Sequence, residues 1–168
     1  MHAQTPVRRV WVSVVGWSPM AVINTLWGAC EQGIVPTHLI LLASEDKPEV
    51  QKSIRIVEKY ARALLAQFGV PDPKMETRSI DEDDLKGFWE TLKQVMAQLK
   101  NSGDRIVLDI TAGRKYMSAL GMALGRWGNI GLEKLYYTHL YDQRYTDVPY
   151  PLIPRHQHRL YDLLETFQ

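Results

Sequence analysis

The chain has 168 residues, with 20 Lys and Arg against 19 Asp and Glu, and 45% of its residues are hydrophobic. This is enough for one domain with a substantial core, and it excludes wholesale disorder. A net charge of +1 gives no overall attraction for a nucleic-acid polymer or an anionic membrane, so an anion site requires local clustering of cations. Cys30 is alone, which excludes an internal disulfide and a Cys-based zinc cluster and fits a reducing cytoplasm.

The first nine residues, MHAQTPVRR, have no apolar signal core. No run in the sequence approaches the ~18 apolar residues needed to span a bilayer. We therefore expect a soluble, untargeted, cytoplasmic protein without a membrane contact.

Strands and helices are predicted to alternate along the chain. Runs of β-branched, aromatic or continuous apolar residues predict strands at 7–15, 38–43, 74–80, 105–110 and 135–140. Apolar residues at spacings of three and four predict helices at 19–32, 49–69, 79–100 and 115–127. Ser79, three residues before Glu82, predicts a capping box at the start of the third helix. After a Pro-rich stretch, VPYPLIPR, a final helix is predicted near 156–167.

This alternation, without a hairpin signal, predicts an α/β fold: a Rossmann-like three-layer sandwich with a mainly parallel sheet and a short C-terminal extension. We expect a single domain over 1–168, with a core at about 7–141 and a C-terminal arm at about 142–168. In the strand order 3-2-1-4-5, the first and fourth strands lie side by side. Ligands bind in such sheets where the loops after those two strands part.

The loop after the fourth strand, TAGRK at 111–115, has the composition of a phosphate site. A small-residue turn opens a helix whose first N–H groups are unpaired, and Arg114 and Lys115 add two cations. The alternative is an ordinary helix start with two solvated cations. The loop is not a Walker A sequence, so nucleoside triphosphate hydrolysis is disfavoured.

The loop after the first strand, GWSP, is expected beside it. Gly16 allows close backbone approach, Ser18 can donate to a phosphate or cap the helix, and Pro19 fixes the first turn. Trp17 can stack on a nucleobase or close the core. Ser44, at the end of the second strand, either lines the same cleft or is an ordinary polar residue of a loop.

No metal and no cofactor are expected. The acidic run at 81–84 lies at a helix start, where capping explains it. The segment VVGWSP has one glycine and lacks the dinucleotide fingerprint, so NAD or FAD binding is disfavoured.

The segment LDITAGRKYMSALGMALG, together with VVGWSP and the stretch ending in LIPR, resembles the CARF (CRISPR-associated Rossmann fold) family over most of the chain. The family motif D-x-T-G-G-x-K-x-M-S is matched at Asp109, Thr111, Gly113, Lys115, Met117 and Ser118. Ala112 stands where glycine is usual, and Arg114 stands where many members have threonine. The Gly-Arg-Lys version is similar to the branch that contains ring nucleases.

The resemblance implies a homodimer that binds a cyclic oligoadenylate, most simply cyclic tetra-adenylate, across its twofold axis, and no polymeric DNA or RNA. It also implies metal-free cleavage of that ring by attack of a ribose 2′-OH, which switches off type III CRISPR signalling. Lys115 and Ser18 are then the catalytic residues. The ligand-binding residues are Gly16, Trp17, Pro19, Ser44, Thr111, Ala112, Gly113, Arg114 and Met117.

Two other functions stay open. A sensor would use the same cleft without cleavage and pass the signal to a separate partner. A metabolic Rossmann-like enzyme would act on a mononucleotide or a sugar phosphate and would ignore cyclic oligoadenylates.

Overall fold

The computed structural model describes residues 7–167. Its strands are β1 (Arg9–Val14), β2 (His38–Ala43), β3 (Lys74–Ser79), β4 (Arg105–Asp109), β5 (Lys134–Leu140) and β6 (His158–Asp162). Its α-helices are α1 (Pro19–Glu31), α2 (Pro48–Gln67), α3 (Leu85–Asn101), α4 (Lys115–Trp127) and α5 (Leu163–Thr166). One sheet has the order β3-β2-β1-β4-β5-β6, parallel except for the β5–β6 pair. The predicted Rossmann-like class and the order 3-2-1-4-5 are confirmed.

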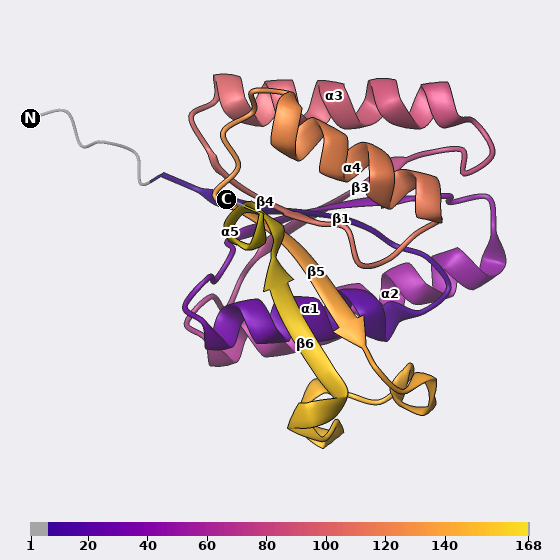
Figure 1. Cartoon of the computed structure of the whole chain (residues 1–168), viewed down its shortest axis with the longest axis vertical. Coiled ribbons are helices and arrows are strands. Elements are labelled where there is room, and N and C mark those ends of the chain that lie inside the picture. The colour runs from indigo at the N-terminus through magenta and orange to yellow at the C-terminus, as the bar shows by residue number, and fades with distance from the viewer. Residues whose placement is uncertain (1–6, 168) are drawn as a thin grey trace, which may run out of the picture.

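Two helical layers cover the sheet, α1 and α2 on one face and α3 and α4 on the other (Figure 1). The central strands β1, β2 and β4 are almost wholly buried because both of their faces carry apolar side chains. Trp11 and Leu39 pack toward α1 and α2, whereas Val12 and Leu42 pack toward α3 and α4. β3 is an edge strand, as predicted, and its side chains are only partly covered.

Three helices, α1, α2 and α4, begin at or within one residue of their predicted first residues. Pro19 and Pro48 are the first residues of α1 and α2, where a missing N–H costs nothing. α4 has the predicted bounds. Within residues 7–167, none of the helices combines the length and the apolar character needed to cross a bilayer.

The predicted C-terminal helix near 156–167 is wrong. Residues 155–157 form a 3₁₀ turn, β6 follows, and only Leu163–Thr166 is α-helical. β6 pairs antiparallel with β5, from Tyr136 opposite Asp162 to Leu140 opposite His158. The reason is that β5 would otherwise leave a row of unpaired backbone groups at the sheet edge, and β6 satisfies them.

The predicted capping box of α3 is also wrong. Ser79 is the last residue of β3, and the N-cap is Asp84, whose Oδ1 accepts a hydrogen bond from the Gly87 N–H at 2.9 Å. Asp81 caps the preceding turn by accepting from the Asp83 N–H at 2.9 Å. The acidic run therefore serves two local turns, and one of its members, Glu82, is left for another role.

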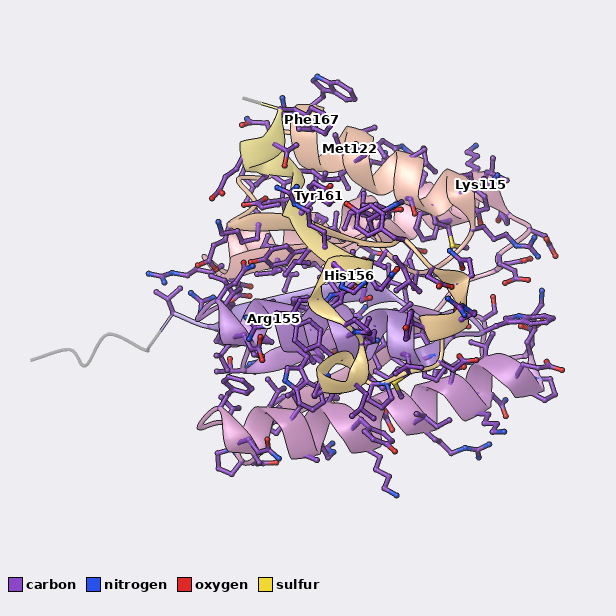
Figure 2. All side chains as sticks on the ribbon, turned by 60° about the horizontal axis from the view of Figure 1, so that its bottom comes forward. Lys115, Met122, Arg155, His156, Tyr161 and Phe167 are labelled. Atoms are coloured by element: carbon purple, nitrogen blue, oxygen red, sulfur yellow. The ribbon has the colours of Figure 1, made fainter. Side chains whose placement is uncertain are left out.

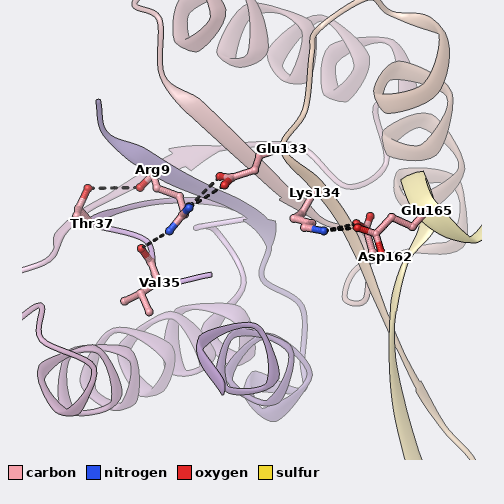
Figure 3. A network of polar contacts seen from close by, with 7 residues as sticks. All are labelled: Arg9, Val35, Thr37, Glu133, Lys134, Asp162 and Glu165. Carbon is pink, nitrogen blue, oxygen red and sulfur yellow. Dashed lines mark hydrogen bonds and ion pairs between the residues drawn. The ribbon is translucent and has the colours of Figure 1, made fainter. Parts of the chain in front are cut away.

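Ion pairs fasten the added strand at the opposite end of the sheet from the β1 and β4 loops (Figure 3). Lys134 on β5 donates to Asp162 at 2.9 Å and to Glu165 at 2.6 Å. Arg9 on β1 makes a two-bond pair with Glu133, at 2.8 and 2.7 Å. Lys134 therefore ties the C-terminal extension to β5 by charge as well as by strand pairing, and the Arg9 pair joins β1 to the residue before β5.

Candidate ligand-binding cleft

The two loops predicted to be neighbours do meet at the carboxyl ends of β1 and β4. An ideal Cβ on Gly16 would lie 3.6 Å from the backbone N of Gly113, which is van der Waals contact. Between the loops lies an open cleft of about 440 Å³. The expected residues that line it are Gly16, Trp17, Ser18, Ser44, Thr111, Ala112, Gly113, Arg114 and Met117.

Two expected residues lie outside this lining. Pro19 is the first residue of α1 and sets the direction of that helix. Lys115 is the first residue of α4, where its exposed side chain extends from the end of the helix remote from Met122 and Phe167 (Figure 2). It makes no hydrogen bond or ion pair with another side chain in 7–167, so its amine is available to a molecule that extends past the rim.

Two serine hydroxyls in the cleft lack a partner. Ser18 occupies the N-cap position of α1 but makes no capping bond with its side chain, and its Oγ is buried. Ser44 is only 3% exposed, and its Oγ also finds no hydrogen-bond partner within residues 7–167. An unpaired buried hydroxyl is costly, so these two groups mark unmet hydrogen-bonding capacity in residues that line the cleft, although protein atoms cover each oxygen.

The helix N-termini beside the cleft add further donors. The first N–H groups of a helix have no intrahelical acceptor, and neither α1 nor α4 is capped by a side chain. α1 offers fewer of these groups because Pro19 has no N–H, and the Ala21 and Met117 N–H groups donate to the Ser18 and Arg114 carbonyls at 3.3 and 2.9 Å. The N–H groups that remain unpaired carry partial positive charge and are suited to an anion. α3, by contrast, is capped by Asp84.

Trp17 stands at the rim of the cleft. Its side chain is 72% exposed, so it does not close the core. Its loop is nevertheless fixed, because the buried Ser53 on α2 donates a hydrogen bond to the Trp17 carbonyl at 3.1 Å. The backbone of Trp17 is thus fixed at the mouth of the cleft, and its indole is exposed there.

A buried carboxyl supports the β4 loop from below. Asp109 is 1% exposed and accepts hydrogen bonds from the Ser13 hydroxyl at 2.8 Å and the Thr111 N–H at 2.9 Å. Burial raises the pKa of Asp109 to about 6, against the opposing effect of those hydrogen bonds. Thr111 Oγ1 in turn accepts from the Thr138 N–H at 2.9 Å. Thr111 therefore positions the loop through its hydroxyl.

Gly113 is required by conformation and by space. Its φ of +96° lies in the left-handed region, and an ideal Cβ there would be 2.8 Å from Val14 Cγ1 and 3.1 Å from Met117 Sδ. Ala112, where the family motif has glycine, is 7% exposed and packs in the core cluster that contains Met20.

Glu82 is a cleft residue that the sequence did not reveal. Its carboxylate accepts hydrogen bonds from Lys47 Nζ and, at 2.6 Å, from the Arg114 guanidinium, and its carbonyl accepts from the Tyr116 hydroxyl at 2.8 Å. The hydrogen bond from Lys47, followed by that from Arg114, holds the pKa of Glu82 below its ordinary value. The negative charge of Glu82 thus pairs with the two cations at the rim, Lys47 and Arg114. Nothing in the acidic run distinguishes this residue from its capping neighbours.

The chain is similar to a CRISPR-associated family in sequence pattern and to solved structures in fold. A family model described as CRISPR-associated protein NE0113 matches residues 18–161. No curated protein matches the chain.

Two similar solved structures carry ligands. Can2 from Sulfobacillus thermosulfidooxidans in complex with cyclic tetra-adenylate is 13% identical, with a TM-score of 0.50 over 81% of this chain and 32% of that one. Csm6 from Enterococcus italicus bound to cyclic hexa-2′-fluoro-hexa-dAMP is 11% identical, with a TM-score of 0.60 over 95% and 42%.

A third similar structure is protein VC1899 from Vibrio cholerae, 8% identical, with a TM-score of 0.54 over 77% of this chain and 30% of that one. At these identities the similarity shows a shared fold. The chain spans less than half the length of each of the three proteins.

Proposed function

The chain belongs to the family of CRISPR-associated protein NE0113, and from that premise we propose that it binds a cyclic oligoadenylate in the cleft between the β1 and β4 loops. The resemblance to CRISPR-associated proteins of Rossmann fold is thereby confirmed. Cyclic tetra-adenylate is the first ligand to test. Can2 is described in complex with that ring, and Csm6 with a cyclic hexanucleotide analogue.

One observation carries the proposal: residues that line the cleft carry hydrogen-bond donors that the described chain itself does not use. The hydroxyls of Ser18 and Ser44 are buried and unpartnered within 7–167, and the uncapped N-termini of α1 and α4 lie beside them. Donors of this kind are suited to phosphate oxygens. With Arg114 at the rim, a nearly neutral chain can bind an anion locally.

We further propose a homodimer. A cyclic tetra-adenylate can be twofold symmetric, so two identical clefts can present matched halves to one ring. Lys115 supports this arrangement because its side chain is exposed, outside the lining of its own cleft and free of side-chain partners in the described chain. A ring that crosses two clefts would pass the Lys115 of each protomer.

The proposed reaction is cleavage without a metal. The ribose 2′-oxygen attacks the adjacent phosphorus while the bond from phosphorus to the 5′-oxygen breaks. Water accepts the 2′ proton, the leaving 5′-oxygen takes a proton from the Lys115 ammonium, and the product has a 2′,3′-cyclic phosphate and a 5′-hydroxyl. Ser18 holds the phosphate in line, and Lys115 stabilises the added charge and protonates the leaving oxygen. Glu82, the carboxylate in the cleft lining, is a weak base, because hydrogen bonds from Lys47 and Arg114 hold its pKa below the ordinary value. We therefore expect slow turnover.

Incubation with cyclic tetra-adenylate in excess EDTA, followed by chromatography against linear standards, tests the reaction. We expect linear products from the wild type, a loss of about a hundredfold or more in rate for Lys115→Ala, and no change for Lys59→Ala, an exposed lysine on α2. Equal cleavage by all three proteins would remove Lys115 from the mechanism.

A sensor without cleavage is the second candidate. The engagement of Arg114 by Glu82 and the position of Lys115 beyond the cleft lining favour it, because neither cation is directed at a phosphate in the free protein. Tight binding with intact ring after long exposure would establish the sensor. A protein that binds mononucleotides and ignores cyclic oligoadenylates would instead be a metabolic enzyme.

A further inference from the structure

We propose that the C-terminal extension forms a separate compartment of the same cleft, and that this compartment binds one adenine base while the β1 and β4 loops hold the phosphate. The inference rests on the proposed function. It assigns base recognition to residues 143–153, which follow the last parallel strand, β5.

The compartment is continuous with the phosphate cleft. A second cavity, of about 160 Å³, shares Ser18, Ala21 and Thr111 with the cleft described above. Its far wall comes from Leu140 at the end of β5 and from the extension, through Gln143, Tyr145 and Ile153 among others. Ser18 thus lines both cavities at the place where they adjoin, and there the ribose would join a base to its phosphate.

A buried side chain fixes the backbone of the extension where it forms the wall of the second cavity. Asn24 on α1 is 8% exposed, its Nδ2 donates to the Val148 carbonyl at 2.9 Å, and its Oδ1 accepts from the Tyr150 N–H at 2.8 Å. Tyr150 also stacks on Trp27 with ring centroids 6.1 Å apart. The extension therefore presents its side chains in a defined position, which reduces the entropy cost of binding.

The two cavities differ in the charged residues of their linings. The phosphate cleft has Arg114 and Glu82 in its lining, whereas the described residues that line the second cavity include no Asp, Glu, Lys or Arg. Its apolar members, such as Met20, Leu140 and Ile153, offer flat contact to a ring. The volume is room for about five water molecules, the size of a single planar heterocycle rather than a whole nucleotide.

The polar groups at its edge fit adenine. A Gln carboxamide can pair with the N6 and N7 atoms of adenine through two hydrogen bonds, and Gln143 is the one Gln in this lining. Tyr145 is half-buried and supplies an aromatic face for stacking. Gln143 and Tyr145 are therefore proposed as the residues that select an adenine base.

Calorimetric titration of the whole chain with cyclic tetra-adenylate tests the compartment. We expect Gln143→Ala and Tyr145→Ala each to weaken binding about ten- to a hundredfold. Asp147→Ala, an exposed residue of the same extension that lies outside the cavity lining, should bind like the wild type. A ring built with 7-deazaadenine lacks the N7 acceptor, so it should bind the wild type more weakly and bind Gln143→Ala no more weakly than the natural ring does.

The outcomes separate the two proposals. Wild-type binding with unchanged affinity in Gln143→Ala and Tyr145→Ala would overturn the compartment and leave the function standing. Equal weakening by Asp147→Ala would also overturn it, because the effect would then be a general disturbance of the extension. A wild type that binds none of the cyclic tri-, tetra- or hexa-adenylates would overturn the proposed function, and the compartment with it. Gln143 is exposed, so its variant tests the idea without a loss of core packing.

Discussion

Replacement of Gly113 by alanine tests the contact between the β4 loop and β1 on which the cleft depends. The added Cβ would lie 2.8 Å from Cγ1 of Val14, a distance that real Cβ contacts essentially never show. Val14 is 8% exposed and β-branched, so it has little freedom to rotate away. The residue must also keep a φ of +96°, which an L side chain rarely adopts.

The expected cost has two parts. A left-handed backbone costs a non-glycine residue about 1–2 kcal/mol, and forcing an extra methyl into a packed site costs about 1–3 kcal/mol more. Gly113→Ala should therefore lower the free energy of unfolding by about 2–5 kcal/mol. Gly33 is the matched control, because its φ is +83° and nothing lies within 4 Å of its ideal Cβ. Gly33→Ala should lose only the backbone part, about 1–2 kcal/mol.

Urea denaturation followed by circular dichroism gives both values, and Val14→Ala provides the decisive background. With Cγ1 removed, the shortest contact disappears, but Met117 Sδ at 3.1 Å and Val14 Cβ at 3.2 Å remain. The cost of Gly113→Ala should therefore fall in this background and stay somewhat above the cost of Gly33→Ala in the wild type. Equal destabilisation by the two glycine variants in the wild type would refute the close packing of the loop on β1.

Three further changes test the charges of the structure. The folded chain holds the Asp109 proton more tightly than the unfolded chain, because the pKa of Asp109 is raised from 3.8 to about 6. Its stabilising contribution is therefore present below about pH 4 and lost as the pH rises through about 6. The wild type should therefore lose about 3 kcal/mol of its free energy of unfolding between about pH 4 and pH 6, and Asp109→Asn should not. Urea denaturation at several pH values measures this, and an equal dependence of unfolding free energy on pH in both proteins would contradict it. Glu82→Gln should tighten cyclic tetra-adenylate binding about ten-fold at low salt, more than Asp83→Asn does, whereas weaker binding would show that Glu82 positions the cations. Lys134→Ala leaves two carboxylates unpaired and should cost about 1–2 kcal/mol in urea denaturation, while Arg144→Ala, on an exposed pair, should have no measurable effect.

The parallel core could be predicted from sequence because local patterns and tertiary packing agree there. The run HLILLA at 38–43 is apolar throughout and becomes the doubly covered β2 with those bounds. β6 could not be predicted in this way. Its segment, HRLYD, continues into LLETF with helix-like spacing, and its strand conformation depends on hydrogen bonds to β5, about twenty residues away.

The meeting of the two loops followed from topology, since adjacent parallel strands end at one edge of the sheet. That reasoning places the residues that leave those strands, such as Ser18 and Gly113, beside one cavity. It does not place side chains that reach the cavity from elsewhere. The extension lines the adjoining cavity because Asn24 holds its backbone, and that contact joins residues more than a hundred positions apart.

Glu82 shows why a count of cations is not a measure of charge at a site. The TAGRK loop predicts two positive charges, but Arg114 is paired with Glu82, which Lys47 also contacts. These residues lie on three different loops, and their separation in sequence hides the pairing. A phosphate that enters the cleft therefore meets a carboxylate already bound to the cations, and its net gain is the difference between two ion pairs. In the proposed complex, affinity then depends on donors that the described chain leaves unpaired, above all the hydroxyls of Ser18 and Ser44.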